Sequence, residues 1–206
     1  MAVAKLLNNV VMPHNKANSA AAKNTGLICG VSLNREHMIN LIIRDELPGD
    51  VNSIEAITIA AFQDVAHADH REQFIVQALR EAGALSISLV AELQGEVVGH
   101  VAVSPVTISD GTEGWFGLGP ISVTPEHQRL SIGSQLMGRA LKKLQSMGAS
   151  GCVLLGDPAY YSRFGFKPRR NLVLPEMPPE YFQALSFNHS FPSGLVTYHE
   201  AFSVSA

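Results

Sequence analysis

The sequence predicts a single α/β domain of the α+β type, and two observations support this fold class. The chain has 206 residues, of which 46% are hydrophobic and 16% charged, so it holds enough apolar material for one substantial core. From Met38 onward, segments whose apolar residues follow a helical spacing alternate with segments whose apolar residues recur at every second position. We therefore expect one domain over residues 38–206.

Residues 1–37 differ in composition from the rest of the chain. They are rich in Ala, Asn, Lys and Ser and show no sustained period, so we expect a disordered N-terminal extension. The apolar run LLNNVVM is shorter than a secretory signal requires, and GLIC before Gly30 lacks the residues expected ahead of a lipidated cysteine. A truncated chain that begins at Met38 is predicted to fold.

The composition excludes some classes of function. A net charge of -3 without a dense Lys/Arg run predicts no nucleic-acid partner and no membrane partner. Cys29 and Cys152 are too few for a disulfide framework and have no paired metal-ligand spacing, which favours a reducing, cytoplasmic location. We expect a cytoplasmic monomer or homodimer without a metal.

The first half of the domain is predicted to contain strand, helix, helix and hairpin. Residues 39–46 read as a strand, 48–62 as a helix that begins near Pro48, and 70–83 as a helix that ends at Gly83. Residues 86–93 and 96–108 then alternate with period two around Gln94 and Gly95, which predicts a long hairpin.

The second half is predicted to begin with an irregular strand over residues 115–125. Gly117, Gly119 and Pro120 interrupt it, and such residues inside a strand indicate a bulge or the close approach of a ligand. A helix from Ile132 that ends at Gly148 and a buried strand over 150–157 are expected next. A short helix should follow, with Asp157 as N-cap, Pro158 at its first position and Gly165 as terminator. The last predicted elements are a further short helix within 178–187 and a strand within 193–202.

The loop before Ile132 is a candidate anion site. A helix N-terminus exposes N–H groups and a partial positive charge, so a diphosphate is stabilised there even in an acidic protein. In the alternative interpretation, Ser131 is only the N-cap of a packed helix and Arg129 is only solvated.

Three stretches resemble the GNAT superfamily of N-acetyltransferases: residues 42–62 its first strand and helix, 119–137 its acetyl-CoA segment, and 159–168 its late helix and GF turn. The combination of GLGPISV at 117–123, VLLGDPAYYSRFGF at 153–166 and PPEYFQAL at 178–185 is similar to the YhbS-like branch. The resemblance covers nearly all of residues 38–202. It implies a central mixed, mostly antiparallel sheet that is splayed between the fourth and fifth strands and flanked by helices.

The resemblance also implies acetyl-CoA as cosubstrate. The family pattern is Gln or Arg, two residues, Gly, one residue, then Gly or Ala, and Ser131 departs from it because glycine is favoured where the backbone needs positive φ. Serine there would strain the loop slightly, cap the helix or offer a hydroxyl to a phosphate. The implied cofactor-binding residues are Ile121, Ser122 and Val123 beside the pantetheine amides, and Gln128, Arg129, Leu130, Ser131, Ile132, Gly133 and Ser134 around the diphosphate.

The reaction implied by the resemblance is direct attack of an amine on the acetyl thioester. Tyr161, four residues before Gly165, stands at the position of the family's usual general acid, although Tyr160 and Tyr161 could both be packing residues. The strand at 115–123 has no acidic residue, so the base is open between a water chain and the side chains of Glu126, His100, Asp64, His67, Asp69 and His70. The acceptor is an unidentified small-molecule or peptide amine. An acyl-CoA-binding or sensing module without catalysis is the alternative function.

Overall fold

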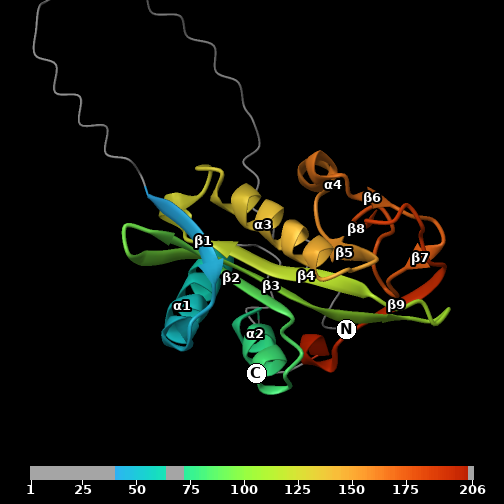
Figure 1. Ribbon diagram of the computed structural model, residues 1–206, viewed down its shortest axis with the longest axis horizontal. Helices are drawn as coiled ribbons and strands as arrows, with labels where there is room; N and C mark the ends of the chain where they lie inside the picture. The colour runs from blue at the N-terminus through green and yellow to red at the C-terminus, as the bar shows by residue number, and fades with distance from the viewer. Residues whose placement is uncertain (1–39, 64–71, 204–206) are drawn as a thin grey trace, which may run out of the picture.

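The computed structural model describes residues 40–63 and 72–203. The sheet follows the order β1-β2-β3-β4-β5-β8-β6, while β9 pairs with the far end of β3 and with β7 (Figure 1). The strands are β1 (Leu41–Asp45), β2 (Ile87–Leu93), β3 (Glu96–Ile108), β4 (Trp115–Val123), β5 (Gly151–Leu155), β6 (Lys167–Pro168), β7 (Leu172–Val173), β8 (Phe182–Ser186) and β9 (Gly194–Tyr198). The predicted extension at 1–37 lies outside the described residues.

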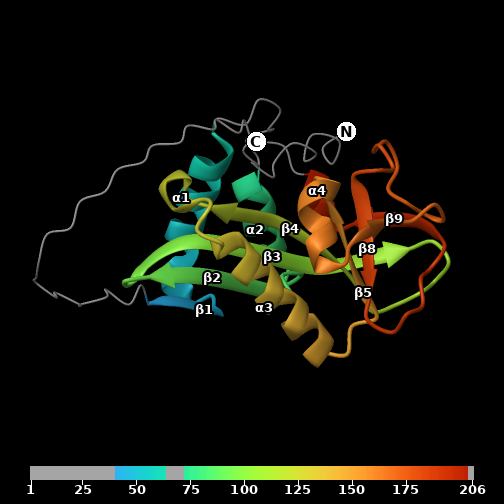
Figure 2. The same cartoon turned by 90° about the horizontal axis from the view of Figure 1, so that it is seen from above.

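The helices cover both faces of this sheet. In Figure 1, α1 (Val51–Phe62) and α2 (Glu72–Glu81) lie on one face, and α3 (Ile132–Ser146) and α4 (Pro158–Tyr161) lie on the other. Seen from above, α4 lies towards β5 and β8 (Figure 2). The remaining helical segments are single 3₁₀ turns, η2 (Pro48–Asp50), η3 (Pro125–His127), η4 (Ser162–Phe164) and η5 (Glu200–Ser203). No helix of the described segments combines the length and the apolar character that crossing a bilayer requires.

The main core lies between the sheet and α3. Leu136, Met137, Ala140 and Leu144 recur at helical spacing and are fully buried, as the predicted apolar face requires. They pack with the residues of β3 and β4 that point towards α3, among them Val101, Val103 and Leu118. The residues between them, such as His100 and Ala102, therefore point towards α1 and α2, because side chains alternate along a strand.

The predicted interruption of β4 is a bulge. Ile121 pairs with Val101 and Leu118 with Val103, so the two residues Gly119 and Pro120 face the single residue Ala102. β4 runs parallel to β5, but the pairing extends only from Trp115 to Gly117 on β4. The splayed, mixed sheet is confirmed.

Most predicted helix ends are confirmed, and one predicted helix is wrong. Asp157 caps α4 by accepting a hydrogen bond of 2.8 Å from the Ala159 N–H, and Gly148 and Gly165 take positive φ where helices end. The segment 178–187 is not helical: a turn over 178–181 leads into β8, which pairs antiparallel with β5 along Gly151–Leu155. Long-range pairing with a buried strand has overridden the local helical pattern.

Candidate active site

The loop before α3 folds as a turn with two residues in the left-handed region. Arg129 has φ 66° and Ser131 has φ 63°, ψ 12°, and neither is glycine. The Ser131 side chain makes no capping hydrogen bond to the helix, so among the alternatives for this serine the structure has the strained backbone and not the helix cap. Ile132 is buried in the main core and Gln128 Nε2 donates to the Val123 carbonyl oxygen at 3.2 Å, which fixes both ends of the loop.

Ser131→Gly is predicted to stabilise the protein slightly. A left-handed backbone costs a non-glycine residue about 1 kcal/mol, and the extra freedom of glycine in the unfolded chain offsets part of the gain. We expect the free energy of unfolding to rise by at most about 1 kcal/mol in chemical denaturation. Ser131→Ala, which removes the hydroxyl but keeps the strain, should stay level with the wild type. A loss of stability in the glycine variant would contradict this account.

The end of β4 presents an open edge beside this loop. Ile121, Ser122 and Val123 pair with β3 on one side, and β5 pairs with none of them on the other. The Ser122 side chain points to α1, where its Oγ lies 3.4 Å from Thr58 Oγ1, so it does not face the opening. Peptide groups directed away from β3 are thus available to an extended ligand.

The two adjacent tyrosines of α4 place their hydroxyl groups differently. Tyr160 Oη lies 3.4 Å from Ser134 Oγ, and a Cβ added to Gly133 would also stand 3.4 Å from Tyr160 Oη. The Tyr160 hydroxyl therefore lies beside the first turn of α3. The guanidinium of Arg163 stacks 4.5 Å from the Tyr160 ring centroid.

Tyr161 is buried, and its ring lies against the backbone just after the end of β5. A Cβ added to Gly156 would come within 2.2 Å of the Tyr161 ring, so only glycine leaves room for it. Burial raises the pKa of Tyr161 above its ordinary value, and the neighbouring Tyr160 and Asp157 raise it further. This phenol therefore keeps its proton throughout the neutral and mildly alkaline range.

Tyr198 of β9 packs against β4 next to the opening, and no motif in the sequence marks this residue. A Cβ on Gly117, the last β4 residue paired with β5, would stand 2.3 Å from the Tyr198 ring. Burial raises the pKa of Tyr198, with further contributions from Cys152 and Tyr161. Neither local spacing nor composition connects Tyr198 with Gly117, because only the fold brings these strands together.

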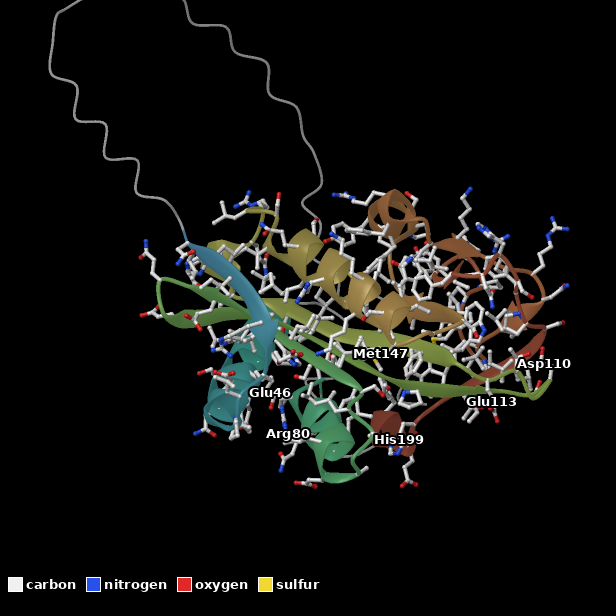
Figure 3. All side chains as sticks on the ribbon, in the orientation of Figure 1. Glu46, Arg80, Asp110, Glu113, Met147 and His199 are labelled. Carbon is white, nitrogen blue, oxygen red and sulfur yellow. The ribbon has the colours of Figure 1, made fainter. Side chains whose placement is uncertain are left out.

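A partly buried polar chain on the α1/α2 face of the sheet leads to the buried His100. Arg80 pairs with Glu46 at 2.7 Å, Ser88 Oγ donates to Glu46, and Ser88 Oγ lies 2.8 Å from His100 Nε2. Figure 3 shows Glu46 and Arg80 between α1 and α2. Since the Ser88 proton goes to the carboxylate, the network assigns the imidazole proton to Nε2 and leaves Nδ1 as an acceptor.

His100 is uncharged in this site. Its side chain is fully buried, and burial, assisted by the charge of Arg80, lowers its pKa to about 3. Of the other candidate bases, Glu126 is exposed on η3, and Asp64, His67, Asp69 and His70 lie outside the described residues. Glu72, which sequence reasoning did not single out, is buried in the first turn of α2.

The lowered pKa of His100 predicts an acid sensitivity. The unfolded chain binds the proton near the ordinary pKa of 6.5 and the folded protein does not until about 3, so stability falls as the pH drops through this window. When the pH falls from 7 to 5, the protonation of His100 in the unfolded chain should lower the free energy of unfolding by about 2 kcal/mol. Denaturation of His100→Gln at both pH values should show a smaller drop by about that amount. Equal drops in the two proteins would refute the assignment.

No three His, Cys, Asp or Glu side chains gather as potential metal ligands within residues 40–63 and 72–203. The features that do converge are an anion-compatible loop, an open strand edge, the buried Tyr161 and the partly buried Tyr198. All of them lie where β4 separates from β5.

Comparisons with known proteins agree with this arrangement. A family model described as an acetyltransferase (GNAT) domain matches residues 43–169. YhbS of Escherichia coli strain K12, an uncharacterized N-acetyltransferase, is 34% identical over 169 residues, which cover 79% of this chain and 98% of YhbS. The crystal structure of a GNAT family acetyltransferase from Brucella melitensis in complex with acetyl-CoA matches with a TM-score of 0.71 and 48% identity, covering 79% of this chain and 97% of that one. The structure of YhbS from Escherichia coli in complex with CoA matches with a TM-score of 0.71 and 33% identity, over 82% of this chain and 94% of that one.

Proposed function

Because the chain belongs to the GNAT acetyltransferase family, we propose that it transfers the acetyl group of acetyl-CoA to a primary amine by direct attack. The single observation that carries this proposal is the opening between β4 and β5, with a helix N-terminus at one end and Tyr161 beside it. Relatives with this fold have been crystallised with acetyl-CoA and with CoA, which supports acetyl-CoA as the cosubstrate.

In the proposed complex, the loop and the start of α3 hold the diphosphate. Residues 128–134 lie at a helix N-terminus, where N–H groups and the helix dipole favour negative charge. Arg129 and Ser131 have left-handed backbones, and loops in which left-handed residues alternate with right-handed ones can direct successive N–H groups at an anion. The Arg129 side chain is exposed, so it can add its charge without first leaving a partner in the core.

The pantetheine arm would then lie along Ile121–Val123 as an added strand. Its amides would pair with the peptide groups that β5 leaves unpaired, and this would bring the thioester to the bulge at Gly119 and Pro120. Backbone N–H groups near Ile121 would polarise the acetyl carbonyl and stabilise the negative charge that develops on it.

The chemistry needs a neutral amine, a path for its proton and a proton donor for the departing thiolate. Tyr161 is the proposed donor, since its raised pKa keeps the phenol protonated. The amine bonds to the carbonyl carbon, the carbon–sulfur bond breaks, and the thiolate takes its proton from Tyr161. The Tyr161 phenolate would regain a proton through water, which balances the proton that the amine releases. His100 is fully buried with its Nε2 beside Ser88 Oγ, so we propose that a chain of water, and not this imidazole, carries the proton of the amine away.

The test is release of free thiol from acetyl-CoA in the presence of amines. The panel contains spermidine, kanamycin, free amino acids, an alanine-initiated tripeptide and a lysine-containing peptide with a blocked N-terminus. We expect calorimetric binding of acetyl-CoA and thiol release with at least one of these amines. Tight binding of acetyl-CoA without thiol release in any arm would favour an acyl-CoA-binding module without catalysis. The Ser131 loop and the absence of an acidic residue in β4 are the observations that keep this alternative in view.

A further inference from the structure

The motif PPEYFQAL at 178–185 forms a turn and the first part of β8, and it holds the backbone just beyond the end of β5. The pairing of β8 with β5 extends as far as Leu155, and Gly156 follows it. The Gly156 N–H donates to the Tyr181 carbonyl oxygen at 2.9 Å, a contact that uses only the backbone of Tyr181. The Gly156 carbonyl oxygen accepts a hydrogen bond of 2.9 Å from Gln183 Nε2. The motif thus holds Gly156 by both its N–H and its C=O.

Gln183 lies on the face of the sheet that α4 covers. Its side chain is buried, with 1% of its surface exposed. Gln183 pairs with Leu154 across the β5–β8 ladder, so the two side chains point to the same face. Leu154 packs in the main core with Tyr161 and Phe166. Figure 2 shows α4 over this part of the sheet, towards β5 and β8.

The orientation of the Gln183 amide follows from its partner. A carbonyl oxygen can only accept a hydrogen bond, so the amide must turn its NH₂ group to Gly156. The Oε1 atom is then left in the core, where nothing in the part of the chain that the structure describes donates to it. A buried acceptor without a donor lowers stability, and methionine or leucine would fill this space without that cost. The hydrogen bond to Gly156 therefore explains the glutamine better than packing does.

Gly156 supports Tyr161 in two ways. Its Cα lies under the tyrosine ring, because a Cβ there would come within 2.2 Å of Cε2 and 2.9 Å of Cδ2. Its carbonyl group belongs to the peptide that leads into Asp157, and the Asp157 carbonyl oxygen accepts from the N–H groups of Tyr160 and Tyr161 at 3.0 and 3.1 Å. The backbone that Gln183 holds is thus in contact with the ring and also begins the helix that carries it. A rotation of this peptide would move the ring by both routes.

We propose that Gln183 is a positioning residue, which fixes the place of the Tyr161 hydroxyl through the backbone of Gly156. The inference rests on the proposed acetyl transfer with Tyr161 as proton donor, and adds to it the residue that holds the donor in place. Because Gln183 is buried, it touches neither acetyl-CoA nor the amine and moves no proton. Its effect is on geometry: a donor must lie within hydrogen-bond reach of the departing sulfur, and a displacement of about 1 Å can slow such a step by about 10²-fold.

The experiment is a double-mutant cycle of Gln183→Met and Tyr161→Phe, with the panel amine that the wild type acetylates fastest. Methionine keeps the length of glutamine but cannot donate to Gly156. In the enzyme with Tyr161 we expect kcat to fall about tenfold at pH 7, while the dissociation constant of acetyl-CoA stays level. In the Tyr161→Phe enzyme no hydroxyl is left to position, so the same substitution should change kcat by less than about twofold. Any fall in melting temperature should be equal in the two backgrounds.

Leu185→Met is the matched control. Leu185 lies two residues further along the same face of β8 and packs against the same core, but it has no group that could hold Gly156. It should keep kcat in both backgrounds. If methionine at position 183 prevents folding, the cycle is run with Gln183→Asn, whose side chain is one carbon shorter and does not reach Gly156. The same criterion applies to it.

Equal losses of kcat with and without the Tyr161 hydroxyl would show that Gln183 supports the fold in general, and this would overturn the inference. A Gln183→Met enzyme with the kcat of the wild type would overturn it as well. Both results leave acetyl transfer intact. A wild-type protein that acetylates no panel amine would instead overturn the proposed function, and this role with it.

Discussion

Tyr161→Phe is expected to slow acetyl transfer by about 10²-fold at pH 7, because it removes the proposed proton donor to the departing thiolate. The ring fits against Gly156, and its edge-to-face contact with Tyr160, at a centroid distance of 4.9 Å, does not involve the hydroxyl. The melting temperature and the affinity for acetyl-CoA should therefore change little. Steady-state kinetics with the best panel amine measure the effect. The deficit should shrink at high pH, where a thiolate with a pKa near 8.5 leaves more readily unaided.

The neighbouring tyrosine provides an informative comparison. Because the Tyr160 hydroxyl lies beside Ser134, Tyr160→Phe is expected to act on acetyl-CoA affinity more than on kcat. Tyr181→Phe is the control that should leave both unchanged. If Tyr161→Phe and Tyr181→Phe turn over equally fast, Tyr161 has no part in the chemistry and solvent supplies the proton.

Gly133→Asp should weaken acetyl-CoA binding at least tenfold, which corresponds to about 1.4 kcal/mol. A Cβ at this position meets its nearest neighbours, Tyr160 Oη and Val123 Cγ2, at 3.4 and 3.8 Å, so the backbone can accept a side chain. A carboxylate in the first turn of α3 also stabilises the free helix. The variant is thus expected to fold normally and to repel the diphosphate, which calorimetry with acetyl-CoA can measure.

Gly133→Asn separates charge from size in that experiment. It has nearly the same shape as the aspartate variant but no charge, so it should lose clearly less affinity. Equal losses in the two variants would indicate steric blockage of the loop, and unchanged affinity in a folded Gly133→Asp protein would place the diphosphate elsewhere.

Local chemistry made several of these features predictable from the sequence. A short helix is specified by the capping and backbone preferences of Asp157, Pro158 and Gly165 alone. The glycines and the proline of β4 predict a bulge for the same kind of local reason. The left-handed backbone at Ser131 was predictable from the motif that usually has glycine there. The structure shows that the serine has this strained conformation and does not cap the helix with its hydroxyl.

Features that depend on long-range pairing were not predictable. The segment around Phe182 has a helical composition, and its pairing with β5 and β6 makes it a strand. Tyr198 is far from Gly117 in sequence. His100 contacts Ser88, and is linked through it to Glu46, only because β2, β3 and the loop after β1 assemble side by side. His100 could be proposed as a candidate base from its residue type, but its lowered pKa follows from burial, which the sequence did not show.

The short pairing between β4 and β5 divides the sheet into two halves that are joined by three residue pairs, Trp115–Gly151, Phe116–Cys152 and Gly117–Val153. A ligand that pairs with the rest of β4 would act as a removable strand and extend the contact between the two halves of the sheet. Cofactor loading should then appear as slower amide hydrogen exchange at Ile121 and Val123, and as closer mechanical coupling of the β5–β8 half to the β1–β4 half. The occupancy of the cofactor would in this way set the stiffness of the whole sheet, and product release would coincide with its loosening.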